Sequence, residues 1–484
     1  MINLFSQRQT VVGDMLRSQA AYEEIQRANR MNLAWRAYYG QMPKPLKSTR
    51  SDPQAKDNVL LNFARVIVDK GVSFLFGQDL DFEITTDGEE TSEDSPEEKY
   101  LDEVWDANHR MTTLQKLALN GAVCGHTFLK LLDRRARGLP PRIVVLDPAT
   151  VTPTHDPDDI ENVTAYRIQY PAIDAATGKP ITVRQLIEQD GTRWHITDQR
   201  SEPDSNTWVT IGEAVWPYSW SPVHDCQNLP APNAYWGIAD LEDDVLAVNN
   251  AINFAVSNLA RILRIHAHPK TWGSGFSADK LDISADETII LPSNNSKLAN
   301  LEMLSDLSSS IEFYKRLKDA LHEVSRVPEV ATGKLDAAGN ISGVALQILY
   351  GPLVEKTETK RRLYGDMLTD LNQHLLEMGG FGADHKVLNK WPELLPGDPL
   401  GEAQTLLLHE QLGVASKETI AAKLGYDWQS EQAKMDAEDS QMGDKLLAGF
   451  DKGQGAVARA GVAPGSGQPP AAGNGGTPAD QMMM

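Results

Sequence analysis

The stretch 238–263 limits the possible folds more than any other part of the chain, because its apolar residues recur at intervals of three and four. These residues are Leu241, Val245, Val248, Ile252, Ala255, Leu259 and Ile262. This spacing predicts one amphipathic helix, and at about 1.5 Å per residue it would reach on the order of 37 Å. Its acidic residues lie at the start and its basic residues at the end, so both ends suit the helix dipole.

A second helix is predicted at 308–328, where Ser309 and Glu312 can form a capping box and Pro328 ends the helix. The segment between the two helices, about 265–306, contains β-branched residues together with Gly and Asn turns. Two long helices around a small β-rich insertion predict a stalk that carries a β lobe at its tip.

The sequence "GNISGVALQILYGPLVEKTETKRR" (339–362) places Gly351 and Pro352 inside an otherwise helical stretch. Proline removes a backbone donor and clashes with the preceding turn, at a cost of about 3 kcal/mol within a helix. The pattern predicts a start on small, turn-prone residues, then an apolar helical run that breaks at Gly351 and Pro352 and continues as a charged helix to Met378.

The remaining segments predict an α+β protein with helices at both ends of a β-rich region. Helices are expected at about 10–39 and at 58–77, where Asn58 is a candidate cap and Gly77 a stop. An exposed strand is expected in "DLDFEITTD", and residues 110–236 are expected to be predominantly β. Short helices are expected at 399–450, and the Gly-, Ala- and Pro-rich tail 451–484 is expected to be disordered.

Composition excludes several classes of function. The net charge of −21 and a pI near 5.0 argue against a sequence-specific DNA-binding protein. Two cysteines exclude a disulfide framework and favour a reducing compartment. We expect no membrane span, because the chain has no run of eighteen apolar residues. The acidic segment 87–98 is expected to be a solvated loop, either for solubility or for a basic partner.

Enzymatic patterns are incomplete. The pair Gly333-Lys334 lacks the first P-loop glycine, and Leu335 stands where a Ser or Thr would bind magnesium. Cys124 and His126 would share a face if they lay on a strand, and they could form a nucleophile and base. A buried cysteine beside a satisfied histidine is the more ordinary interpretation.

Two short runs could begin a metal site: "HAHP" (His266, His268) and "HDPDD" (His155, Asp156, Asp158, Asp159). Neither has a spaced third and fourth ligand nearby, so surface turns are the simpler interpretation. A metal-dependent hydrolase that uses the Asp-rich turns is therefore the alternative function, and we expect no cofactor.

Three stretches resemble the portal protein of tailed bacteriophages of the siphophage type. They are "NFARVIVDKGVSFLFGQDLDFEI", "GNISGVALQILYGPLVEKTETKR" and "LGVASKETIAAKLGYDWQSEQAKM". The first resembles a helix that ends in Phe-Gly before an exposed strand. The second is similar to a Ser-Gly-x-Ala-Leu entry into a kinked tunnel helix, and the third is similar to a Ser-Lys-Glu-Thr crown segment. With the order of helix, β lobe and helix, the resemblance covers roughly residues 10–440.

The resemblance implies an α+β portal fold made of a wing, stem helices, a β-rich clip, a kinked tunnel helix and a helical crown. The implied segments are a wing at 1–236, stem helices at 237–264 and 307–330 around a clip at 265–306, a tunnel loop, kinked tunnel helix and return to the wing at 331–398, crown helices at 399–450, and a disordered tail at 451–484. The implied function is non-enzymatic: a ring-shaped channel at the capsid vertex for DNA packaging and ejection.

The resemblance also assigns expected site residues, with the tunnel loop at 334–342 and the kinked helix from Gly343 to Met378. The residues that would line the DNA channel are Lys334, Gly339, Asn340, Ser342 and Gly343. The helix kink would lie at Gly351 and Pro352. Contacts between subunits in the stem would involve Leu241, Val248, Leu259 and Leu321. No catalytic residue and no metal are expected.

The implied partners are copies of the same chain in a dodecameric ring and double-stranded DNA held without sequence preference. The large terminase, a head-completion adaptor, and the major capsid and scaffolding proteins would also bind. The expected location is the portal vertex of the virion, with assembly in the cytoplasm of a bacterial host.

Overall fold

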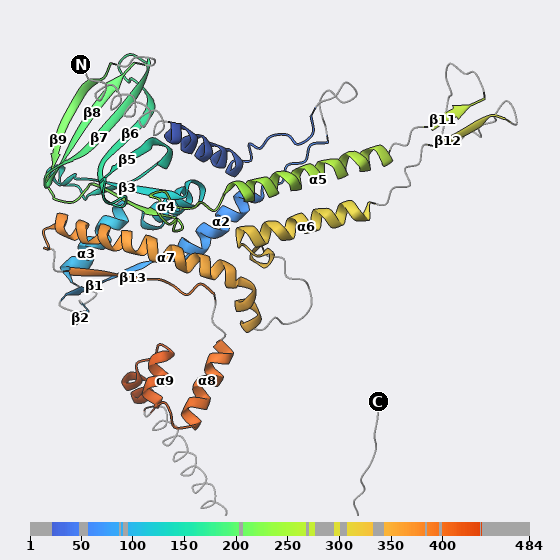
Figure 1. Ribbon diagram of the computed structural model, residues 1–484. Coiled ribbons are helices and arrows are strands. Elements are labelled where there is room, and N and C mark those ends of the chain that lie inside the picture. Colours follow the sequence, from blue (N-terminus) through green and yellow to red (C-terminus); the bar gives the residue numbers. More distant parts are fainter. Residues whose placement is uncertain are drawn as a thin grey trace, which may run out of the picture. The chain divides into compact units, whose positions relative to one another are not determined.

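The structure is a computed structural model. It describes residues 22–47, 57–86, 89–90, 95–202, 207–267, 271–275, 295–300, 307–332, 343–382, 385–395, 399–435 and 437. Contacts divide the chain into two units, 1–396 and 397–484, which are described separately. Figure 1 shows the first unit as an α+β body from which two long helices project.

Helices form one part of the body. Helix 22–38 is followed by α2 (Phe63–Phe76), α3 (Pro96–Ala107) and α4 (Arg110–Cys124). Asn62 caps α2 by accepting from the Arg65 N–H, and Ser95 caps α3 by accepting from the Glu98 N–H. Gly125 ends α4 in the left-handed region at φ 82°, and a Cβ there would meet the Gly237 carbonyl oxygen at 2.4 Å.

Two three-stranded sheets lie beside these helices. One has the order β13-β1-β2, from β1 (Asp81–Thr86), β2 (Glu89–Glu90) and β13 (His385–Lys390). The other has the order β10-β3-β4, from β3 (His126–Leu132), β4 (Arg142–Leu146) and β10 (Val223–Gln227). All their pairings are antiparallel.

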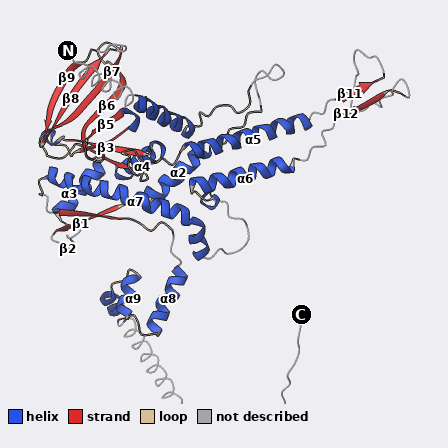
Figure 2. Cartoon of the chain, in the orientation of Figure 1, coloured by secondary structure: helices blue, strands red, loops and turns tan. Residues whose placement is uncertain are grey.

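A five-stranded antiparallel meander completes the body (Figure 2). Its strands are β5 (Val151–His155), β6 (Val163–Ile173), β7 (Pro180–Asp190), β8 (Arg193–Ser201) and β9 (Val209–Trp216). The short helices η1 (Arg135–Arg137) and η2 (Pro148–Thr150) lie in the connections before it. The register between β6 and β7 runs from Ala165↔Glu188 to Ile173↔Pro180, and the register between β7 and β8 runs from Thr182↔Ser201 to Asp190↔Arg193.

Helices α5 (Asp243–Ala267) and α6 (Ser308–Ser325) run antiparallel to each other, and we call them the arm (Figure 1). The segment between them contains the paired strands β11 (Thr271–Ser274) and β12 (Lys297–Asn300). Because β11 begins four residues after the end of α5, this hairpin lies at the far end of the arm.

After α6, the short helix η3 (Glu329–Thr332) leads to α7 (Gly343–Gly379), which contains Pro352 and bends over its first turns in Figure 1. The later turns of α7 supply much of the main core, including Tyr364, Leu368, Leu371 and Leu375. The second unit contains α8 (Pro399–Gln411), α9 (Lys417–Lys423), which Ser416 caps, and a helical stretch at 428–435.

Several sequence expectations were wrong in detail. Asn58 does not cap the apolar helix; its side chain bonds the backbone of Leu46, and the helix begins at Phe63. Residues 110–124 form α4, although this part of the chain was expected to be β. The end of the acidic segment is also helical, since Pro96, Glu97 and Glu98 form the first turn of α3. Acidic residues in a first turn are stabilised by the helix dipole.

Candidate functional site

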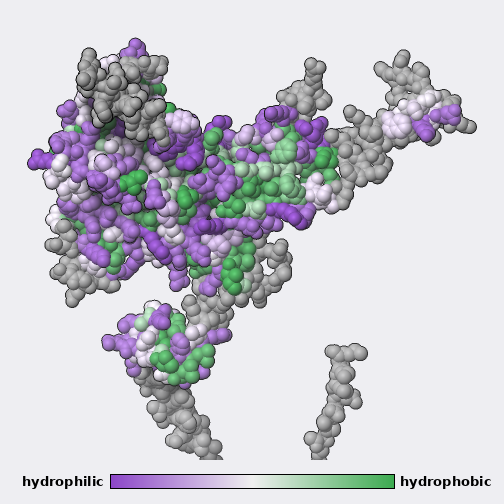
Figure 3. All heavy atoms as spheres, viewed as in Figure 1, coloured by the Kyte–Doolittle hydropathy of each residue, from purple (hydrophilic) through white to green (hydrophobic). Residues whose placement is uncertain are grey.

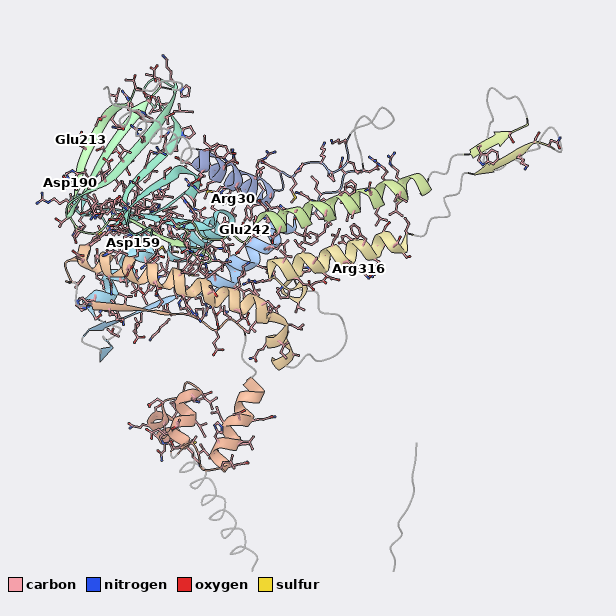
Figure 4. All side chains as sticks on the ribbon, in the orientation of Figure 1. Arg30, Asp159, Asp190, Glu213, Glu242 and Arg316 are labelled. Carbon is pink, nitrogen blue, oxygen red and sulfur yellow. The ribbon has the colours of Figure 1, made fainter. Side chains whose placement is uncertain are left out.

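Buried charged residues from several elements meet at the base of the arm. Helix α5 begins at Asp243, and Glu242, labelled in Figure 4, accepts a hydrogen bond from the Ala239 N–H at 2.9 Å. Asp240 lies three residues before the helix and is fully buried. Around it converge the end of α6, the middle of α7 and one turn of α2.

Asp240 binds two lysines of α7. Its carboxylate lies 2.7 Å from Lys360 Nζ and 3.2 Å from Lys356 Nζ, and these two side chains are only 2% and 6% exposed. Lys356 also donates to the carbonyl of Ser325, the last residue of α6. A Cβ at Gly71 of α2 would lie 2.9 Å from an Asp240 oxygen, so glycine leaves the room that this cluster needs. We call Asp240, Lys356 and Lys360 the buried ionic junction.

The junction contains more positive than negative charge. Burial alone would raise the pKa of Asp240, but the two ammonium groups lower it well below its usual value. Burial lowers the pKa of Lys360 to about 8, although Asp240 partly opposes this shift. Removing one partner of a buried ion pair is costly, so the junction fixes α7 against the start of α5 and the end of α6.

A second set of contacts holds a strap, residues 57–64, along α5. Three buried polar side chains spaced one helical turn apart, Asn249, Asn253 and Ser257, bond its backbone. Asn249 accepts a hydrogen bond from the Ala64 N–H and donates one to the Leu61 carbonyl. Asn253 accepts a hydrogen bond from the Leu61 N–H. Ser257 accepts from the N–H of Val59 and donates to its carbonyl. We call these three side chains the polar ladder.

An ion pair continues this contact toward the tip of the arm. Asp57, whose side chain is 5% exposed, accepts two hydrogen bonds of 2.6 Å from Arg264 and lies 3.6 Å from Arg261. The bidentate geometry is the strong form of an arginine–carboxylate contact. Together, the ladder and this pair join the body to about four turns of α5, from Asn249 to Arg264.

Apolar side chains remain exposed on the arm. They are Phe254 and Leu263 on α5, and Ile311, Phe313 and Val324 on α6. Figure 3 shows hydrophobic residues gathered along the arm. Exposed aromatic and aliphatic residues on neighbouring helices are typical of a surface that another protein covers.

The expected stem contacts divide into two groups. Leu241 and Leu321 are 2% and 0% exposed within a single chain and belong to the core at the base of the arm. Their assignment to contacts between subunits is therefore wrong, because no surface of either side chain is left for a neighbour. Val248 and Leu259 are half-buried, and their assignment stays a prediction.

The expected channel residues Lys334, Gly339, Asn340 and Ser342 lie outside the described residues. Gly343 is the first residue of α7, and Gly351 and Pro352 lie within this helix. Pro352 cannot donate a hydrogen bond to the carbonyl four residues earlier, and the bend over the first turns of α7 is consistent with this loss (Figure 1).

The candidate metal and nucleophile residues fall into ordinary structural roles. The carboxylates of Asp156 and Asp159 accept backbone N–H groups within their own turn. His266 lies in the last turn of α5, and His268 lies outside the described residues. Over the described part of the chain, three or more His, Cys, Asp or Glu side chains do not gather as a metal site would require.

Cys124 and His126 do not share a strand face, because Cys124 ends α4 and His126 begins β3. Burial raises the pKa of the Cys124 thiol to about 12, which disfavours the thiolate that a nucleophile needs. His126 Nε2 lies 2.9 Å from Asp225, which also accepts from the hydroxyls of Tyr166 and Tyr235. This buried network, which the sequence did not indicate, joins β3, β6 and β10.

A comparison with protein families identifies the family of the chain. The model of the family "Phage portal protein, SPP1 Gp6-like" matches residues 18–445. The chain belongs to this family, which confirms the resemblance, and it is therefore a non-enzymatic structural component of the virion. Membership implies an oligomeric ring and favours this interpretation over a metal-dependent hydrolase.

Two solved structures are similar to the chain. The first is a chain from the neck of an empty GTA particle computed with C6 symmetry, with 14% identity, a TM-score of 0.43, and coverage of 79% of this chain and 95% of that chain. The second is from the virion of a native gene transfer agent particle, with 13% identity, a TM-score of 0.40, and coverage of 75% and 89%. No curated protein sequence matches the chain. Among the described helices, none combines the length and apolar character that a bilayer crossing requires.

Proposed function

We propose that this chain assembles into a ring-shaped channel at the capsid vertex through which double-stranded DNA is packaged and ejected. The observation that carries the proposal is the family match over residues 18–445. On this proposal the ring contains twelve subunits in the virion, the arm is the stem, and the hairpin β11–β12 belongs to the clip. The wing, tunnel and crown segments keep the boundaries that the sequence suggests.

The loop before α7 is proposed to face the channel. Residues 334–342 belong to the segment between η3 and α7, and they include Gly339, Asn340 and Ser342. Small polar residues have neither the charge to hold phosphates nor the bulk to block a duplex. On this proposal Pro352 and the two lysines of the buried ionic junction, all in α7, set the direction of the helix that follows the loop.

Charge supports sliding rather than tight binding. Twelve copies with a net charge of −21 each carry −252 formal charges. Each phosphate contact by Lys or Arg adds affinity through counterion release, so a strongly acidic ring holds DNA weakly and without sequence preference. DNA that must move through a channel requires contacts of this weak kind.

The proposed protein partners are the large terminase and a head-completion adaptor, with the major capsid and scaffolding proteins around the ring. The hairpin β11–β12 is proposed as a docking element, because a two-stranded sheet has edges that can pair with another strand.

Purified full-length protein tests the ring directly. Negative-stain images should show rings with a central hole, and native mass spectrometry should give a mass that is a multiple of the 53.3 kDa chain. Compact monomers over a wide range of protein and salt concentrations would contradict the proposal.

A further inference from the structure

An apolar pocket of about 490 Å³ lies between helix 22–38 and the first turns of α5. Leu33, Ala37 and Met42 line it on one side, and Leu246 and Ala247 line it on the other. Arg36 and Asp243 add one charge of each sign. Leu33 is 58% exposed, so a substantial apolar surface stays open to solvent in the single chain.

The pocket continues along one face of α5. Asp243, Ala247, Asn250 and Phe254 are spaced by four, three and four residues, so they lie on the same side of the helix. All four are exposed, and Phe254 follows Asn250 by one turn. We call this face, together with the pocket, the pocket flank.

Helix α6 has an apolar face of its own. Phe313, Ala320 and Val324 are spaced by seven and four residues, which places them on one side of the helix. Phe313 is 55% exposed, Val324 is 42% exposed, and Ala320 is half-buried. We call this face the knob flank. Because α5 and α6 run antiparallel, Val324 near the end of α6 lies at the same level of the arm as the pocket near the start of α5 (Figure 1).

The two flanks do not meet within one chain. Figure 1 shows helix 22–38 against the side of α5 that is turned away from α6, and the pocket lies between that helix and α5. In a ring with rotational symmetry, each contact joins two different faces of the same chain. Each subunit must therefore offer one face to its left-hand neighbour and a complementary one to its right-hand neighbour.

We propose that the knob flank of one subunit packs into the pocket flank of the next, with Val324 and Ala320 seated against Leu33 and Ala247. This inference rests on the proposed ring, and it names the surfaces that close it. The knob flank presents Phe313 and Val324, and the pocket flank offers a hollow lined by Leu33, Leu246 and Ala247 with polar residues at its edge. A rotation about an axis along the arm keeps the two flanks at the same level. The contact gives helix 22–38 a role at the subunit boundary, outside the two helices of the arm.

Thiol cross-linking of the full-length chain tests the contact. The double variant Ala247→Cys with Val324→Cys is treated with a short bismaleimide and separated on a denaturing gel. Wild-type protein gives the background from the buried Cys124 and the half-buried Cys226. The matched control is Ala247→Cys with Ile311→Cys, since Ile311 is equally exposed on α6 but lies on another face and at the other end. Native mass spectrometry of the same samples reports assembly.

The contact predicts a series of covalent multimers for the variant with Val324→Cys, in a yield at least tenfold above that of the variant with Ile311→Cys and above that of wild type. Rings that form without these multimers, or equal yields in both variants, would overturn the contact and leave the proposed ring intact. Wild-type protein that forms no rings would overturn the contact and the proposed function together.

Discussion

Replacing Asp240 with Asn should destabilise the body strongly, because the change removes the only carboxylate of the buried ionic junction. The substitution keeps the size of the side chain but leaves Lys360 and Lys356 buried, with exposures of 2% and 6%. Removing one partner of a buried ion pair costs about 3–5 kcal/mol. We expect the free energy of unfolding to fall by this amount at pH 7.

Lys360→Met is the matched comparison. It leaves Asp240 paired with Lys356 at 3.2 Å and replaces a buried ammonium group with an apolar chain of similar length. Folding lowers the pKa of Lys360 from 10.5 to about 8, which corresponds to a cost of about 3 kcal/mol for keeping its charge in the folded state. We therefore expect Lys360→Met to stay within about 1 kcal/mol of wild type.

The dependence on pH gives an independent readout. Between pH 8 and 10.5 the unfolded chain holds the Lys360 proton more tightly than the folded chain, so this residue makes wild-type stability rise with pH over that range. Lys360→Met should reduce the rise. Asp240 acts at acidic pH. Folding lowers the pKa of its carboxyl group below the ordinary value of 3.8, so Asp240 stabilises the folded chain above that pH, and this stability is lost as the pH falls.

Urea unfolding followed by tryptophan fluorescence measures these differences, on samples that native mass spectrometry shows to be monomeric, because assembly would add its own stability. Equal losses for Lys360→Met and Asp240→Asn would refute the reasoning, since they would mean that Asp240 needs both lysines. An unchanged slope between pH 8 and 10.5 in Lys360→Met would refute the assignment of the titrating group.

Three further perturbations test the strap, the loop and the bend. Asn253→Leu should cost about 1–3 kcal/mol in urea unfolding, because the Leu61 N–H loses its buried acceptor; a loss below about 0.5 kcal/mol would show that the strap does not need the ladder. Asn340→Arg should give assembled rings that package DNA slowly or incompletely, and full-length genomes packaged at the normal rate would remove the loop from the channel wall. Pro352→Ala should straighten the first turns of α7 and change ring geometry, so unchanged ring dimensions in electron micrographs would rule out that role.

The elements with strong local signals could be predicted from the sequence. Helix α5 was expected at 238–263 and lies at Asp243–Ala267, because its apolar spacing marks one face over many turns. Helix α7 was expected from Gly343 to Met378 and ends at Gly379. Helix α4 was missed because it lies next to a long run of β-branched strands, and tertiary packing decides such short segments.

The contacts at the base of the arm could not be predicted, because their partners are far apart in the sequence. Asn253 and Ser257 bond residues 192 and 198 positions away, and in the sequence they are simply polar residues in a helix. Asp240 was interpreted as one of several acidic residues that favour the helix dipole. Its real partner Lys360 lies 120 positions later in the chain.

The strap has a mechanical consequence for the DNA channel that we propose. The three rungs of the ladder, at Asn249, Asn253 and Ser257, and the ion pair of Asp57 lie at successive levels along α5. A pull along the axis of the arm loads these contacts in shear, so they share the force and must break together. A pull across the arm would peel them one at a time. The arm is therefore stiffest along its own length, and an axial thrust on the arm is passed to the body as a rigid displacement.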